Sequence, residues 1–155
     1  MGYSVDTCVI IDIHKNHYPK DIFPALWQSF EGLIKEGSIL FTMEVLNELK
    51  AKDDDCYDWA NSFKYAFVDE AEYWQEAQSI GAANPGIVKP NKQDNADPFV
   101  IALAKSRNLI VVSSEGEGAG KIHRACQSCG VRSMNFVGFL REQKLRFDIN
   151  SPKEP

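Results

Sequence analysis

Short apolar runs alternate along this chain with longer segments in which apolar residues recur at helical spacing. The short runs predict strands at 3–5, 39–41 and 109–113, with a further strand near 131–134. The clearest helical spacing begins at Pro24 and stops at Gly37. Other helices are expected from Cys8 to Ile13, after the N-cap Thr42, over 56–66 and 69–80, from Asp97 to Asn108, up to Gly130 and over 136–143, with loops at 14–24 and 81–95.

This alternation of strands and helices predicts an α/β fold in three α/β/α layers. A short parallel sheet of four to five strands would carry helices on both faces. Residues 1–149 are expected to form a single domain, and 150–155, which contain two prolines, a frayed tail. In such open sheets the ligand site lies beyond the carboxyl ends of the strands, so the side chains that follow each strand are the candidates for chemistry.

Composition narrows the class of protein. The 155 residues are 44% apolar and include 9 Phe, 5 Tyr and 3 Trp, which is enough to build a packed core and excludes intrinsic disorder. No apolar run approaches the roughly 20 residues of a membrane span, and no export signal opens the chain. Four cysteines without an export signal are expected to be reduced thiols, so the sequence predicts a soluble, cytoplasmic protein.

The net charge of −5 is unevenly distributed. Residues 1–85 contain 6 Lys and Arg against 15 Asp and Glu, a balance of −9, whereas residues 86–155 contain 11 against 7, a balance of +4. Such asymmetry is typical of a chain that binds a polyanion on one side or a basic partner on the other. Two differently charged solvated surfaces explain it equally well.

Four carboxylates fall where this topology brings them to one edge of the sheet. Asp6 directly follows the first strand, and Glu48 lies on the helix after the second. Asp97 opens the helix before the 109–113 strand, and Glu115 follows that strand. Clustered carboxylates repel one another unless cations neutralise them, and hard oxygen ligands suit Mg²⁺ or Mn²⁺. The four acids together therefore predict a divalent-metal site that could act on a phosphodiester.

Each acid alone also has a structural explanation. Asp6 could cap the following helix, and Glu48 could pair with Lys52 on a solvated helix face. Asp97 could be an N-cap that precedes a proline, and Glu115 could serve solubility in a Gly-rich loop.

The same residues resemble the four acidic motifs of PIN-domain ribonucleases, in the same order and at similar separations. The resemblance runs from about Tyr3 to Gln143, and from Tyr18 to Lys50 it is closest to a PIN-like bacterial family of unassigned function that is related to toxins of toxin–antitoxin pairs. The segments that carry it read Val5-Asp6-Thr7-Cys8-Val9, Glu48-Leu49-Lys50, Asp97-Pro98-Phe99-Val100-Ile101-Ala102-Leu103-Ala104 and Val112-Ser113-Ser114-Glu115.

This resemblance implies a PIN-like fold and a Mg²⁺- or Mn²⁺-dependent endoribonuclease, the toxin of a toxin–antitoxin pair. Asp6, Glu48, Asp97 and Glu115 would be the catalytic metal ligands. The supporting residues would be Thr7 and Ser113, which would orient carboxylates by hydrogen bonds, and Asp94, which is otherwise a loop residue.

The first motif departs from the family, because Cys8 stands where Asn is usual. A thiol cannot replace the donor and acceptor of an amide. The alternative is therefore a catalytically weak PIN-like scaffold that acts as a protein- or RNA-binding module.

Two kinds of partner are implied. An RNA substrate would be bound by basic residues near the site in sequence, which are Lys89, Lys92, Lys121, His123 and Arg124. A small antitoxin protein would bind the acidic helices from Glu44 to Glu76, in a groove around Trp27 and Trp59 with Trp74 as a further anchor. The sequence leaves a homodimer open.

Two other motifs are weaker. The glycines of 116–121 are one residue too close for a phosphate-binding loop, and Ile122 replaces its hydroxyl residue. Cys126 and Cys129 have no second ligand pair for zinc, and they end a helix instead of opening one as a redox pair would. We expect two small core thiols there.

Overall fold

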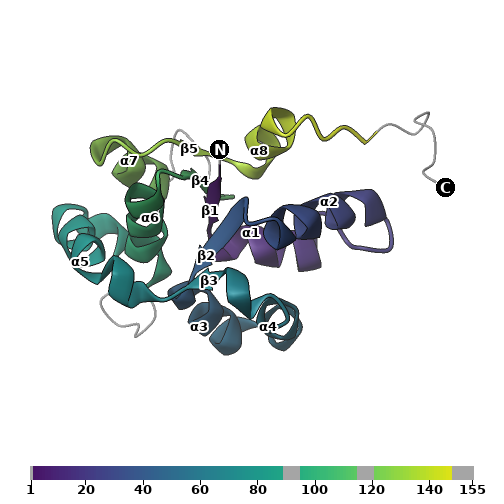
Figure 1. Ribbon diagram of the computed structural model, residues 1–155, viewed down its shortest axis with the longest axis horizontal. Coiled ribbons are helices and arrows are strands. Elements are labelled where there is room, and N and C mark those ends of the chain that lie inside the picture. The colour runs from purple at the N-terminus through teal and green to yellow at the C-terminus, as the bar shows by residue number, and fades with distance from the viewer. Residues whose placement is uncertain (1, 89–94, 115–120, 148–155) are drawn as a thin grey trace.

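The computed structural model describes residues 2–88, 95–114 and 121–147, and its centre is a parallel sheet with the strand order β3-β2-β1-β4-β5 (Figure 1). The register pairs Ser4 with Leu40, Val5 with Val112, and Thr42 with Val68. The carboxyl ends of β1, β2 and β4 therefore meet at one edge. The strands are β1 (Tyr3–Val5), β2 (Ile39–Thr42), β3 (Phe67–Val68), β4 (Ile110–Val112) and β5 (Ser133–Met134).

Helices cover both faces of this sheet, as the sequence predicts. In Figure 1, α5, α6 and α7 lie on one side, α1, α2 and α8 lie on the other, and α3 and α4 lie together below the sheet. The three-layer α/β/α class is thus confirmed. The helices are α1 (Thr7–Ile11), α2 (Pro24–Lys35), α3 (Met43–Lys52), α4 (Asp54–Asn61), α5 (Trp74–Ala83), α6 (Ala96–Arg107), α7 (Lys121–Ser128) and α8 (Phe136–Glu142).

Helix α6 is the central helix of its layer. It contacts β1, β2 and β4 on the sheet and also packs against α3 and α5, so the run from Phe99 to Ala104 is buried. Ser4 ties β1 to this helix by donating a hydrogen bond from Oγ to the carbonyl of Val100 at 2.8 Å. Asn108 ends α6 in the left-handed conformation, with φ of 56°, which Asn tolerates better than most residues.

The structure differs from the sequence prediction in two segments. The helix after Asp6 does not give way to a loop at His14, because a π-helical turn (Asp12–Asn16) continues it. The 56–66 and 69–80 helices are also wrong in extent. A short strand, β3, lies between α4 and α5, flanked by 3₁₀ turns at Lys64–Ala66 and Glu70–Glu72. Phe67 enters the sheet because its ring stacks on Phe41 of β2, with centroids 4.6 Å apart. This tertiary contact outweighs the local pattern.

Other boundaries shift by a few residues. Helix α5 extends to Ala83, into the segment expected to be a loop, and a further 3₁₀ turn follows at Pro85–Ile87. All four cysteines are free thiols; Cys126 is fully buried as expected of a core thiol, whereas Cys129 is only partly buried against the core. Among the described residues no helix is both long and apolar enough to cross a bilayer.

His14, in the π-helical turn, packs between two indoles. Its ring centroid lies 4.3 Å from that of Trp27 and 4.8 Å from that of Trp59, both at steep angles. Its Nδ1 is 2.8 Å from the carbonyl oxygen of Ile10, whereas Nε2 is buried without a partner in the described structure. Burial lowers the pKa of His14 below its ordinary value of 6.5.

Protonation of His14 should therefore destabilise the fold. The unfolded chain takes up a proton on this side chain near pH 6.5, and the folded protein does so only at lower pH, so His14 should lower the free energy of unfolding progressively below pH 6.5. Urea unfolding of wild type and His14→Phe at pH 7.5 and pH 5.5 measures this. The free energy of unfolding of His14→Phe should fall less between pH 7.5 and pH 5.5 than that of wild type. The variant His17→Gln, at an exposed position of the same segment, should behave like wild type. Equal losses in all three proteins would contradict this role.

Candidate metal and phosphodiester site

Asp6 is a buried carboxylate at the carboxyl end of β1, with only 4% of its surface exposed. It is the N-cap of α1, and its Oδ1 accepts a hydrogen bond from the backbone N–H of Thr7 at 2.8 Å. Its Oδ2 accepts from Ser113 Oγ at 3.0 Å and from Cys8 Sγ at 3.3 Å. Ser113 directly follows β4, so side chains from the ends of two adjacent strands fix this carboxylate.

Two of the predicted supporting residues, Ser113 and Thr7, and the departing Cys8 act differently on Asp6. Ser113 is fully buried and makes the orienting hydrogen bond that the motif implies. Thr7 reaches Asp6 through its backbone, and its hydroxyl has no partner in the described structure, so the expected hydroxyl bond is not made. Cys8 accepts a hydrogen bond from the Ser114 N–H at 3.3 Å, and burial raises the pKa of its thiol. Cys8 therefore stays protonated at neutral pH and serves as a donor to Asp6.

Glu48 is also buried, so the alternative of a solvated helix face does not hold, although its pairing with Lys52 does. Its Oε2 accepts a hydrogen bond of 3.2 Å from the backbone N–H of Ala96, the first residue of α6. Its Oε1 lies 3.9 Å from Lys52 Nζ, one turn further along α3. The side chain of the N-cap residue Asn95 makes no capping hydrogen bond to α6. The Glu48 carboxylate, which belongs to α3, caps this helix instead.

Asp97 is the second residue of α6, not its N-cap as the simpler interpretation supposed. It is partly buried and lines a cavity of about 160 Å³ together with Asp6 and Glu48. Three of the four predicted acids thus converge at the carboxyl edge of the sheet. The fourth, Glu115, lies outside the described residues, as do Asp94, Lys89 and Lys92.

Two further charged residues line the same cavity, Asp12 and Lys52. Sequence reasoning missed Asp12 because it assigned no site to the turn after α1. The spacing gave no signal, because at 3.6 residues per turn a position six residues on lies about 120° away around a regular helix. Lys52 was noted only as a partner of Glu48, although here its positive charge faces a cavity lined by four carboxylates.

The negative charges in this cavity affect one another. Burial raises the pKa of Asp6 above its usual value, the hydrogen bond from Cys8 lowers it, and the nearby charge of Glu48 raises it again. A carboxylate in these surroundings is stabilised by any cation that approaches it.

The donor set fits a hard divalent cation in its chemistry. Carboxylate oxygens are the preferred ligands of Mg²⁺ and Mn²⁺, and the unpartnered Thr7 hydroxyl lies in the same cavity wall. The described side chains nevertheless form no group of three His, Cys, Asp or Glu that encloses an ion. Asp6 and Glu48 already accept hydrogen bonds, so ligation requires these carboxylates to rearrange.

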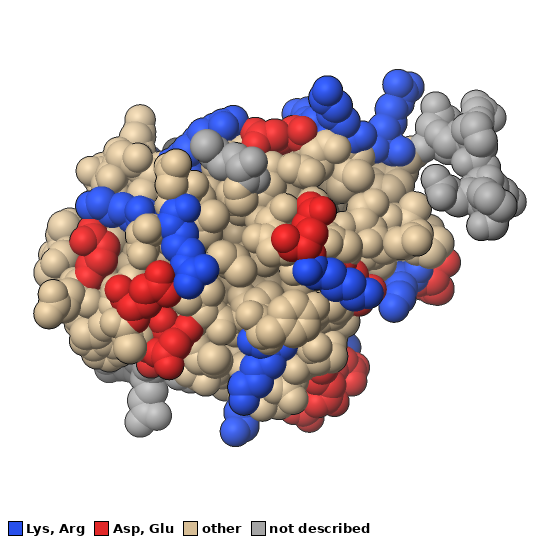
Figure 2. Space-filling view, viewed as in Figure 1, with Lys and Arg blue, Asp and Glu red and all other residues tan. Residues whose placement is uncertain are grey.

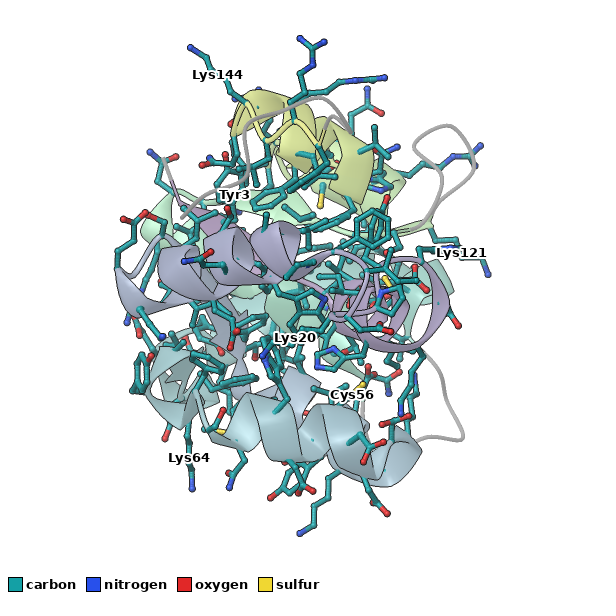
Figure 3. The ribbon with its side chains drawn as sticks, turned by 90° about the vertical axis from the view of Figure 1, so that its right-hand side faces the viewer. Tyr3, Lys20, Cys56, Lys64, Lys121 and Lys144 are labelled. Atoms are coloured by element: carbon teal, nitrogen blue, oxygen red, sulfur yellow. The ribbon has the colours of Figure 1, made fainter. Side chains whose placement is uncertain are left out.

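The basic residues are less closely associated with the cavity. Lys121 and Arg124 lie exposed on α7, and Figure 3 shows Lys121 projecting from the surface. Neither lines the carboxylate cavity. His123 is buried, with Nδ1 2.8 Å from Ser133 Oγ, so its proposed contact with RNA phosphate is wrong.

Trp27, at the centre of the predicted groove, is a buried side chain in this structure. Trp27 is only 3% exposed, and its Nε1 donates a hydrogen bond to the carbonyl of Tyr18 at 2.7 Å. Trp59 packs against it, with ring centroids 5.8 Å apart. Trp27 is a core residue and Trp59 is partly buried against the core, whereas Trp74 is exposed.

The structure is thus a parallel α/β fold with a carboxylate-lined cavity at the carboxyl edge of its sheet. The fold is similar to that of a chain of VapBC2 from Rickettsia felis, whose structure was solved bound to a DNA fragment from the VapBC2 promoter. The TM-score is 0.54, and the two sequences are 17% identical over 88% of this chain and 99% of that chain. The fold is also similar to that of FitAcB from Neisseria gonorrhoeae, with a TM-score of 0.50 and 15% identity over 86% and 96% of the two chains. The chain belongs to the family described as Domain of unknown function (DUF4411), whose profile matches residues 3–147. No match was found among curated proteins.

Removing the charge of Glu48 should lower the pKa of Asp6. In Glu48→Gln the repulsion is lost, while an amide oxygen remains to accept the hydrogen bond of Ala96. The titration of the Asp6 carboxyl carbon, followed by NMR, should move to lower pH. Glu36→Gln, at an exposed position next to Gly37, is the matched control and should leave that titration unchanged. An Asp6 titration that is identical in all three proteins would refute the coupling.

Proposed function

We propose that this protein is a Mg²⁺- or Mn²⁺-dependent endoribonuclease and the toxin of a toxin–antitoxin pair. The convergence of Asp6, Glu48 and Asp97 in one cavity at the carboxyl edge of a parallel sheet carries the proposal. The motif resemblance to PIN-domain ribonucleases and the fold shared with VapBC2 and FitAcB support it. The metal ligands would be Asp6, Glu48, Asp97 and Glu115.

The chain's own residues would have distinct roles in this reaction. A bound divalent ion would polarise the phosphodiester and stabilise charge on the leaving oxygen. Ser113 and Cys8 hold the Asp6 carboxylate in place by hydrogen bonds. Lys52 offsets part of the negative charge next to Glu48. The exposed Lys121 and Arg124, with Lys89 and Lys92, would contact RNA phosphates, and Asp94 would support the acids.

The second candidate is a PIN-like binding module without efficient catalysis. Cys8 at a position where Asn is usual favours it, since a protonated thiol offers Asp6 a single weak donor. The buried carboxylates favour the nuclease, because a binding module gains nothing from burying repelling charges.

Divalent metal should stabilise the wild-type protein. At a metal concentration of 100 times Kd, linkage raises the free energy of unfolding by about 2.7 kcal/mol. Thermal unfolding with and without millimolar MnCl₂, together with calorimetric titration, measures the effect. Asp97→Asn should lose most of this stabilisation by Mn²⁺, whereas Asp58→Asn, on the exposed face of α4, should retain it. Absence of saturable Mn²⁺ binding in wild type would favour the binding module.

Cleavage of single-stranded RNA should depend on the same carboxylates. Asp6→Asn or Asp97→Asn should reduce the metal-dependent rate by about 100-fold or more, since an amide keeps the shape but removes the charge that holds the ion. Cys8→Asn should leave the rate intact or raise it. The rates are measured on a labelled RNA after treatment with EDTA and readdition of Mn²⁺. Wild-type cleavage by Asp97→Asn would show that the activity comes from elsewhere.

A further inference from the structure

Trp74 is a large apolar side chain held in an exposed position. It is the first residue of α5, and 48% of its surface is exposed. The indole is buttressed from below by Phe99 of α6, with ring centroids 5.4 Å apart. An aromatic ring held rigidly at the surface costs little conformational entropy when a partner covers it, which is why such residues dominate binding energies at interfaces.

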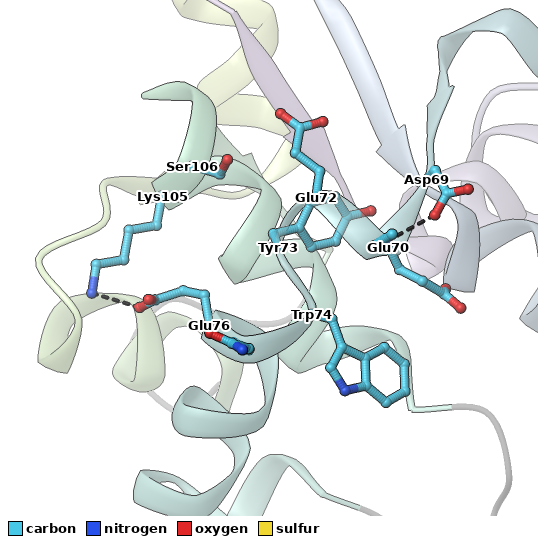
Figure 4. Close-up of a pocket in the computed structure, with 10 residues that line it drawn as sticks. Asp69, Glu70, Glu72, Tyr73, Trp74, Glu76, Lys105 and Ser106 are labelled. Atoms are coloured by element: carbon cyan, nitrogen blue, oxygen red, sulfur yellow. Dashed lines mark hydrogen bonds and ion pairs between the residues drawn. The ribbon is translucent and has the colours of Figure 1, made fainter.

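Trp74 separates two cavities and lines both of them. One, of about 990 Å³, lies beside the Glu70–Glu72 turn and the end of α6 at Lys105 and Ser106. The other, of about 470 Å³, lies between α5 and the start of α6 and is lined mainly by small or apolar residues such as Ala77, Gly81 and Phe99. Figure 4 shows the indole projecting away from the ribbon, with the Glu76–Lys105 pair on one side and Glu70 on the other. We call the two cavities and the indole between them the Trp74 surface.

The Trp74 surface is acidic. Among the described residues that line it there are five carboxylates and one lysine. Figure 2 shows acidic side chains gathered on the α5 side of the molecule, with a few basic ones among them. Glu72 pairs with Arg107 at 2.8 Å and Glu76 with Lys105 at 2.7 Å, whereas Glu70 Oε2 is buried and no donor in the described structure reaches it. None of the ion pairs among the described residues includes Glu70 or Asp69, so their negative charge favours a cationic partner at this surface.

This surface runs toward the carboxylate cavity. The larger hollow adjoins the carboxyl-terminal end of α6, and the smaller one reaches Asn95 and Pro98, which flank Asp97. Helix α6 has 12 residues, so the two ends are about 18 Å apart at 1.5 Å per residue. A helix of three to four turns would cover this length.

We propose that the Trp74 surface binds a basic, amphipathic helix of a partner protein. Apolar residues of that helix would fill the smaller cavity and cover the indole, and its Lys or Arg side chains would pair with Glu70 and Asp69. Like charges would face each other if a second copy docked there by a two-fold axis, and an acidic surface repels RNA. The proposal rests on the toxin role proposed above, which makes the partner an antitoxin. It places that partner next to Asp97.

The experiment uses a synthetic peptide probe. A peptide of about 16 residues, with Leu at helical spacing and Lys and Arg elsewhere, is labelled and titrated by fluorescence anisotropy against the full chain. Wild type should bind it, more weakly as salt rises. Trp74→Ala should weaken binding by about 30-fold, the loss typical of a central aromatic anchor, and Glu70→Gln by about fivefold. Ile22→Ala, at another exposed apolar position, should bind like wild type.

Three outcomes would overturn the proposal: equal affinity of Trp74→Ala and wild type, equal binding of a peptide with Glu in place of every Lys and Arg, or a homodimer of wild type that Trp74→Ala dissociates in sedimentation. Circular dichroism checks that each variant is folded. Titrations repeated on Asp97→Asn separate the two proposals, because this variant should lack RNA cleavage and still bind the peptide. Peptide binding without any wild-type cleavage would therefore refute the nuclease and leave the Trp74 surface standing.

Discussion

The arrangement of this protein's candidate site depends on one buried carboxylate, that of Asp6. Its oxygens accept hydrogen bonds from Thr7, Ser113 and Cys8, so the ends of β1 and β4 and the start of α1 are fixed relative to one another. Burying a charge is costly, and in the described part of the structure hydrogen bonds from neutral donors offset part of that cost. This desolvation cost falls at the edge of the sheet where ligands bind in proteins of this architecture.

A second carboxylate links the other half of the site. Glu48 belongs to α3 but caps the first turn of α6 by accepting a hydrogen bond from the backbone N–H of Ala96. Because Ala96 directly precedes Asp97, this bond fixes the position of Asp97 relative to α3. The Glu48 carboxylate also raises the pKa of Asp6. The Glu48 side chain therefore both connects α3 to α6 and repels the charge of Asp6. The Lys52 ammonium relieves part of this repulsion, but at 3.9 Å and in partial contact with water it does so weakly.

The two faces of α6 serve different purposes. Toward the sheet its apolar residues form the centre of the core, and at its first turn Asp97 faces the carboxylate cavity. Toward α5 it supports Trp74 through Phe99 and provides Lys105 to the rim of the larger cavity. Since one rigid helix connects the acidic cavity to the Trp74 surface, a ligand at either place contacts the same element.

The sequence by itself determined the class of fold and most of the element order, because strand runs such as 109–113 and the helical spacing after Pro24 are strong local signals. It also identified the acids Asp6, Glu48 and Asp97, since residues after parallel strands must meet at one edge. Only the tertiary structure decided the rest. Strand β3 forms because Phe67 stacks on Phe41, Trp27 and Trp59 turn inward around His14, and Asp12 and Lys52 join the cavity. These outcomes depend on contacts between segments far apart in the chain, which local spacing does not encode.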